Sequence, residues 1–260
     1  MSEFGLSLRE EAHCSVLLPH PPEFCRLLEI PGSALDSLQL RRGISEMCAA
    51  RQLAWGVRDL VDPALARRLA EEGESLRLEA LRKFESRARA AMAGGATWAS
   101  VDLDAGRAVV DAGYARKVIS LLCQFAGIAA RIGYDCPLYV PVRIPAPGNA
   151  ADPDLLLRFR HALPLPYLAL VFELHPHEPG ALAWDGMEKL RFAARLWRIC
   201  FAPASGNKLA PAALSRFIRP GTPPAPEPLR ILFSPEGANA ADAYTMEQLS
   251  ETAEKWGGEK

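Results

Sequence analysis

Short apolar runs alternate with helix-like segments along almost the whole chain, and this alternation limits the possible folds more than any other feature. The runs are rich in β-branched, leucine and aromatic residues and lie at 4–8, 25–30, 53–58, 97–104, 138–144, 167–174, 195–201 and 229–233. Most are apolar nearly throughout, as strands are when both faces of their sheet are covered. Strands that alternate with helices indicate βα units and a parallel sheet.

The segments between these runs have the marks of helices. Two Asp-Pro pairs, at 62–63 and 152–153, place a capping side chain before a proline at the first helical position. Apolar residues recur at helical spacing over 81–92, 118–132 and 246–256. These stripes predict helix faces that pack on a core, not cofactor sites.

The length of 260 residues allows two small domains or one barrel of alternating strands and helices. No linker divides the chain, because the proline-rich stretch 219–228 lies just before the last strand and is predicted to be a surface loop. We therefore predict an α/β fold: a single domain spanning 1–260, built as a (β/α)8 TIM barrel with eight parallel strands. Its first unit need not be regular.

Composition excludes several classes of protein. With 49% hydrophobic residues the chain is not disordered, and 30 Lys and Arg against 31 Asp and Glu give no basic excess for binding nucleic acid. The N-terminal residues are charged, and the longest uncharged stretch, 118–130, is shorter than the roughly 20 apolar residues that a membrane span needs. We expect a cytoplasmic protein with no nucleic-acid or membrane partner.

Four common cofactor-binding and catalytic motifs are absent, and the cysteines form no recognisable site. There is no glycine-rich dinucleotide fingerprint, Walker A motif, nucleophile elbow or H-E-x-x-H pair. The six cysteines are widely spaced without a C-x-x-C pair, which is typical of reduced thiols. They are Cys14, Cys25, Cys48, Cys123, Cys136 and Cys200.

The densest polar cluster follows the most continuous apolar run. Glu173, His175 and His177 alternate there, so on an extended chain they share one side. Imidazole and carboxylate groups suit a divalent metal and also serve as acid and base. We predict Glu173, His175 and His177 as metal ligands and Glu173 and His175 as catalytic residues, with an ordinary surface loop as the alternative.

Other charged residues are expected at strand ends, where the active face of a barrel lies. Arg58 and Arg143 would grip an anionic group of a substrate. Asp102 would bind a metal or sugar hydroxyls, or cap the next helix. The predicted substrate-binding residues are Glu29, Arg58, Asp102, Arg143 and Glu236, and Lys208 is predicted as a catalytic cation. A structural network of charges across the barrel mouth is the alternative.

The layout resembles the xylose isomerase-like TIM barrels, the sugar phosphate isomerase/epimerase group. The resemblance covers most of the chain and is clearest over 62–178. Segment 62–102 looks like that family's helix into its fourth strand, and 114–143 looks like its approach to the fifth. Segment 172–177 looks like its sixth strand, which usually carries an acidic residue with a histidine shortly after.

The sequence departs from this family at its usual metal ligands. The resemblance implies a glutamate on strand five, a histidine on strand seven and a glutamate on strand eight, where this chain has Arg143, Arg198-Ile-Cys200 and Ser234. A guanidinium in place of a carboxylate repels a divalent cation. A bound Mn, Zn or Mg ion and no metal at all therefore stay open as alternatives.

Two functions follow from the resemblance. The first is an isomerase, epimerase or lyase acting on a sugar or related hydroxy-carbonyl compound, with Glu173 or His175 as base and Arg143 or Lys208 polarising the carbonyl oxygen. The second is a degenerate, non-catalytic barrel that binds a ligand or a partner protein, with 219–228 and the Trp184 and Trp197 region at the interface. The expected partner is a sugar-like small molecule, and a homo-oligomer is compatible with either function.

Overall fold

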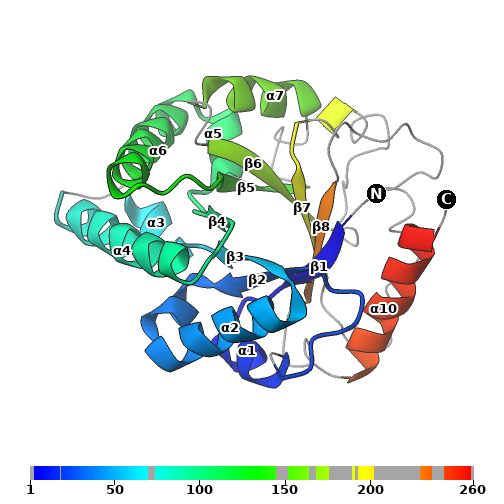
Figure 1. Ribbon diagram of the computed structural model, residues 1–260. Helices are drawn as coiled ribbons and strands as arrows, with labels where there is room; N and C mark the ends of the chain where they lie inside the picture. The colour runs from blue at the N-terminus through cyan, green and yellow to red at the C-terminus, as the bar shows by residue number, and fades with distance from the viewer. Residues whose placement is uncertain are drawn as a thin grey trace.

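The centre of the molecule is a closed barrel of eight parallel strands in chain order, as the alternation predicts (Figure 1). The structure is a computed structural model, which describes residues 3–17, 19–69, 74–144, 152–163, 168–175, 189–190, 193–201, 229–235 and 243–258. The strands are β1 (Glu3–Ser7), β2 (Leu27–Pro31), β3 (Ala54–Arg58), β4 (Trp98–Ser100), β5 (Leu138–Ile144), β6 (Leu168–Leu174), β7 (Leu196–Phe201) and β8 (Arg230–Pro235). Strand β8 pairs with β1 and closes the barrel.

In the part of the chain that the structure describes, helices follow strands β1 to β5 and β8 and lie outside the barrel (Figure 1). They are α1 (Glu11–Leu17), the 3-10 helix η1 (Gly32–Asp36), α2 (Leu38–Arg51), α3 (Pro63–Leu69), α4 (Glu74–Ala93), α5 (Ala105–Val110), α6 (Ala112–Ile132), α7 (Pro153–Ala162) and α10 (Ala243–Gly258). Among the described residues of the first connection, the helix is the seven-residue α1. The prediction of an α/β barrel with eight parallel strands is confirmed.

Local sequence explains the helix starts and one short strand. Asp152 caps α7 as predicted, because its side chain accepts a hydrogen bond from the Asp154 backbone N–H at 2.9 Å. Strand β4 ends at Ser100, earlier than predicted, because Asp102 accepts from the backbone N–H of Asp104 and turns the chain. Asp104 then caps α5.

Strand β5 includes Pro141, although proline removes a backbone donor. Pairing of β5 with β4 covers only Leu138 and Tyr139, so the proline nitrogen lies beyond that ladder. Pairing with β6 continues through Pro141 to Ile144. The proline therefore fits where the neighbouring strand has already ended.

Apolar side chains form two clusters, one on each side of the barrel wall. The larger lies between strands and helices, where for example the rings of Phe84 and Phe125 pack with centroids 4.6 Å apart. Trp197 belongs to this cluster: it is buried, donates a hydrogen bond to the Ala194 carbonyl and packs on Phe172. The predicted role of Trp197 at an interface is therefore wrong.

The structure also bears on the membrane prediction. Among the helices in the described ranges, none combines the length and the apolar character that a membrane span requires. The proline-rich stretch 219–228 and Trp184 lie outside those ranges.

Candidate functional site

The smaller apolar cluster fills the barrel interior and forms a floor under the site. Its members are Leu27, Trp98, Tyr139, Val171, Leu196 and Leu232. Gly56 makes room for the Trp98 indole, because a Cβ built on Gly56 would lie 2.1–2.3 Å from three indole atoms. The indole N–H donates a 3.1 Å hydrogen bond to Oε1 of Glu29, so the floor meets a charged layer above it.

That charged layer begins with a fully buried ion pair between Glu29 and Arg198. Nε and Nη2 of Arg198 donate to the two carboxylate oxygens of Glu29, both at 2.7 Å, and both side chains are 0% exposed. The Ser7 hydroxyl donates to Glu29 Oε2 at 2.6 Å, and Ser100 Oγ accepts from Arg198 at 2.9 Å. Together with Trp98, these groups give Glu29 four donors, which compensate for its removal from water.

A second guanidinium, that of Arg58, links this pair to Glu173. Arg58 Nη1 donates to the hydroxyls of Ser7 and Ser234, each at 2.9 Å. Arg58 Nη2 donates to Glu173 Oε1 at 2.6 Å, and Arg198 Nη1 donates to the same oxygen at 2.9 Å. We call Glu29, Arg198, Glu173 and Arg58 the charge network. Its two carboxylates balance its two guanidinium groups.

The network keeps its carboxylates ionised. Burial alone would raise the pKa of Glu173, but the charges of Arg58, Arg198 and Arg9 lower it to about 2. Burial also works to raise the pKa of Glu29, and the charge and hydrogen bonds of Arg198 bring it below its usual range. Since both pKa values lie below neutral pH, the network is fully charged there.

Asp59 behaves in the opposite way. It follows β3 with a φ of 59°, and its backbone N–H donates to Ser100 Oγ at 3.1 Å. Its carboxyl is 17% exposed, and burial raises the pKa of Asp59 to about 6, against the opposing charges of Arg58 and Arg198. A carboxyl with this pKa can exchange a proton near neutral pH.

A cavity of about 550 Å³ opens above the network, at the carboxyl ends of the strands. Its ionisable lining residues are Arg9, Arg58, Asp59, Asp62, Asp102, Asp104, Arg143, Glu173 and His175. The aspartates follow β3 and β4, whereas Arg143 lies on β5, His175 follows β6 and Arg9 follows β1. Cationic and anionic groups from several strands therefore line the cavity together.

The structure brings together most of the predicted site residues that it describes. Arg58, Asp102, Arg143, Glu173 and His175 all line the cavity. Glu29 does not: it lies in the middle of β2 and points into the charged layer, so its predicted position at a strand end is wrong. Three predicted residues lie outside the described ranges, namely His177, Lys208 and Glu236.

Sequence reasoning gave no role to Arg198, which is central to the network. The sequence did contain a sign of its role, because Arg198 is a single charged residue within the apolar strand β7. Ser7 and Ser100 were not considered either, and Ser234 was noted only as a departure from the family's glutamate on strand eight. A lone serine on a strand says nothing in sequence about the guanidinium that will bind it, because the partner comes from another strand.

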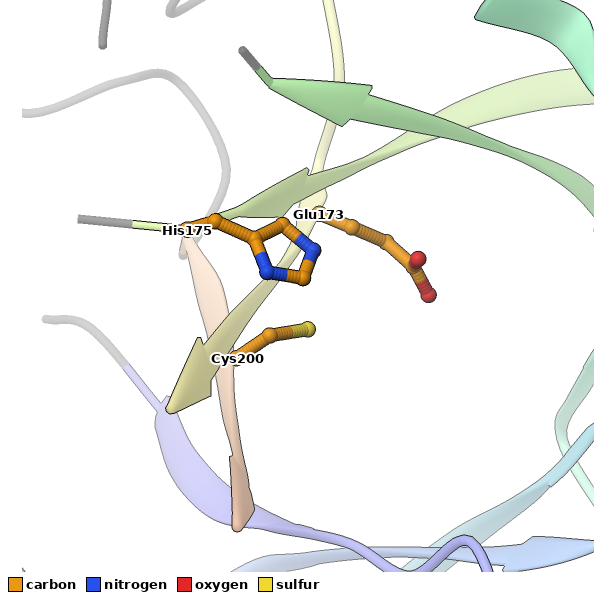
Figure 2. A group of neighbouring side chains, drawn as sticks. All are labelled: Glu173, His175 and Cys200. Atoms are coloured by element: carbon orange, nitrogen blue, oxygen red, sulfur yellow. The ribbon is translucent and has the colours of Figure 1, made fainter. Parts of the chain in front are cut away.

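Glu173, His175 and Cys200 form a possible metal-ligand group, with their ligand atoms within 4.8 Å of one another (Figure 2). Cys200 was not predicted in this role, and the predicted ligand His177 lies outside the described ranges. Two of the three groups already contact guanidinium groups. Arg58 and Arg198 bind Glu173, and Arg9 Nη2 lies 3.5 Å from the sulfur of Cys200. This donor set does not fit a divalent cation, because three positive charges lie against its ligands.

Comparison by sequence and by structure gives different results. No family model matches the sequence. No curated protein matches it either. Solved structures match over nearly the whole chain, at sequence identities low enough that the likeness concerns the fold alone.

Three of these structures have xylose isomerase-like or epimerase folds. A 3-keto-D-glucoside 4-epimerase from E. coli matches at 14% identity, over 97% of this chain and 99% of its own, with a TM-score of 0.65. A D-tagatose 3-epimerase-like protein matches at 15% over 98% of both chains, with a TM-score of 0.66. A xylose isomerase domain protein from Planctomyces limnophilus matches at 13% over 99% of both, with a TM-score of 0.63.

A chemically different protein matches as well. A GH18 chitinase from Pseudoalteromonas aurantia is 9% identical, with a TM-score of 0.57, over 96% of this chain and all of its own. The likeness in fold to xylose isomerase-like barrels is therefore confirmed. The reaction has to be argued from the cavity itself.

Proposed function

We propose that this protein binds a sugar-like hydroxy-carbonyl compound in the cavity and catalyses its isomerisation or epimerisation. The observation that carries the proposal is the convergence of carboxylate, guanidinium and imidazole groups on one 550 Å³ cavity at the carboxyl ends of the strands. That volume suits a small ligand, and mixed polar groups suit its hydroxyls. The epimerases among the similar folds support the same substrate class.

Such a reaction needs a base that takes a proton beside a carbonyl and a cation that polarises the carbonyl oxygen. A carboxylate with a pKa of about 2 is a weak base, so Glu173 is better suited to holding a substrate hydroxyl. We assign proton transfer to His175, with Asp59 as a second acid or base, and the polarising role to Arg143. All three line the cavity.

The test is a panel of ketoses, aldoses and their keto derivatives, with binding followed by thermal shift and turnover by NMR. We expect one class of sugar to raise Tm and to be converted. His175→Asn should lower turnover by roughly 100-fold or more, since general acid–base groups contribute that much. Arg131→Gln, a change in an exposed ion pair with Glu85, is the matched control and should leave turnover unchanged. A panel with neither binding nor turnover would overturn the proposal.

A non-catalytic ligand-binding barrel is the second candidate. It is favoured by the double contact of Arg58 and Arg198 with Glu173 Oε1, which ties one oxygen of the predicted base to fixed cations. In this case the same sugar panel gives a Tm rise without any conversion. The panel therefore separates the two functions in one experiment.

A further inference from the structure

We propose that the guanidinium groups of Arg58 and Arg198 take the place of a metal ion in this barrel. They hold Glu173 in place and exclude a divalent metal from the group formed by Glu173, His175 and Cys200. Residues at the carboxyl ends of β6 and β7 otherwise offer carboxylate, imidazole and thiol groups close together (Figure 2). What distinguishes this site is the set of positive charges already bound to those groups.

The geometry of Arg198 supports this role. Its three nitrogens reach both carboxylates, binding the fully buried Glu29 twice at 2.7 Å and the partly buried Glu173 once at 2.9 Å. The single planar guanidinium of Arg198 on β7 thus bridges β2 and β6. A lysine ammonium, which is a point charge on a flexible chain, would do this less well. Arg198 is 0% exposed, so water does not screen this attraction.

Charge balance leads to the same conclusion. Glu29 and Glu173 are neutralised by Arg58 and Arg198, with every one of these contacts between 2.6 and 2.9 Å. A divalent ion at Glu173, His175 and Cys200 would add two charges to a balanced and largely buried group. It would also lie beside Arg9, which already contacts the sulfur of Cys200. Ions of this kind need a net negative ligand set, which this arrangement lacks.

Metal alone is the probe. The full chain is purified, its metal content is measured after incubation with MnCl2 or ZnSO4 and desalting, and Tm is recorded with each salt and with EDTA. We expect no stoichiometric metal and no change in Tm. A stoichiometric ion in the wild-type protein, or a Tm that rises with metal and falls with EDTA, would overturn the proposal.

Variants of Arg198 test the cause. Arg198→His removes the fork and adds an imidazole beside Glu29, which loses its ion pair, and Glu173, which keeps its bond to Arg58. Tm should therefore rise by roughly 5 °C with Mn²⁺ or Zn²⁺, and EDTA should reverse the rise. Arg198→Lys retains the positive charge and should show no rise in Tm with either metal. Arg143→His is the matched control, because it also exchanges a cavity arginine for histidine but leaves the network intact, and it should gain nothing.

The following outcomes would contradict the proposal or decide it. A folded Arg198→His that binds no metal, or an Arg143→His that gains the same metal response, contradicts the exclusion by Arg198. If Arg198→His does not fold, the wild-type measurement decides. None of these readouts depends on the proposed sugar substrate, so a failed sugar panel leaves the metal result standing.

Discussion

At Gly56 the missing side chain decides whether the floor of the site can form. A Cβ at this position would overlap the Trp98 indole, which is fully buried and donates to Glu29. Gly56→Ala should therefore displace the indole and cost about 1–3 kcal/mol of unfolding free energy, as overpacking does. Urea denaturation measures this loss.

The matched control for this substitution is Gly43→Ala in α2. A Cβ there meets nothing within 4 Å, and the position is exposed. Because alanine favours helix, this change should stabilise the protein by up to about 1 kcal/mol. Equal losses in the two variants would contradict the role of Gly56 as the space for Trp98.

Asp59 gives a prediction about pH. Its folded pKa of about 6 lies above its ordinary 3.8, so the folded state binds more protons than the unfolded state between these values. Stability from this group is therefore fully present below pH 3.8 and lost as the pH rises through 6. Asp59→Asn, which keeps a neutral group and tolerates positive φ, should exceed wild type in stability at pH 7 by on the order of 2 kcal/mol.

The two proteins should converge in stability as the pH falls to 4, which denaturation curves at several pH values will show. Asp104→Asn is the control, since it changes the same chemical group at another positive-φ position facing the cavity. A stability difference between Asp59→Asn and wild type that does not vary with pH would contradict this explanation.

At the scale of elements, the capping of α7 can be tested directly. Asp152→Ala removes the acceptor for the Asp154 backbone N–H and should cost about 1 kcal/mol of unfolding free energy, with faster amide exchange in the first turn of α7. Asp152→Asn keeps a capping oxygen and should lose little. Equal losses would show that the charge of Asp152, and not its hydrogen bond, stabilises the helix.

Elements were predictable because each follows from neighbouring residues. All eight strands overlap the predicted apolar runs, and Asp152 caps the predicted helix. Strand β4 was predicted too long because Val101 and Leu103 are as apolar as strand residues, although they are buried outside the sheet. Apolar residues report burial, and burial does not distinguish a strand from a packed turn.

The site was less predictable, for a physical reason. Glu173, Arg58 and Arg143 were identified from their positions at strand ends, and the cavity joins them. Arg198 and the serines on β1, β4 and β8 act through contacts across the barrel, between residues as far apart as 58 and 234. Which side chains meet across the interior depends on strand register, and register is not read from one sequence.

For the whole molecule, the charge network predicts the response to acid. The pKa of Glu173 is lowered from 4.5 to about 2, so its contribution is present above pH 4.5 and is lost as the pH falls toward 2. We expect a loss of about 3 kcal/mol from this group over that interval, with Glu29 adding to it. Circular dichroism along a pH series measures the loss.

The unfolding should also be a single transition if residues 1–260 form one domain, as we propose. Coincident curves from far-ultraviolet circular dichroism and from tryptophan fluorescence would agree with this. Two separated transitions would contradict it.

High salt should change the loss of stability in acid only a little, because the charge network is largely buried and salt screens it poorly.

The bond pattern of Arg58 has a consequence for how the protein is made. One nitrogen, Nη1, donates both to Ser7 on the first strand and to Ser234 on the last. Of the eight strands, β1 leaves the ribosome first and β8 last, so these two acceptors meet only after all eight strands have been synthesised. The carboxylates and guanidinium groups inside cannot leave water before that moment without a large cost. The nascent chain should thus keep its interior hydrated until the final strand arrives, and the site should appear together with the finished barrel.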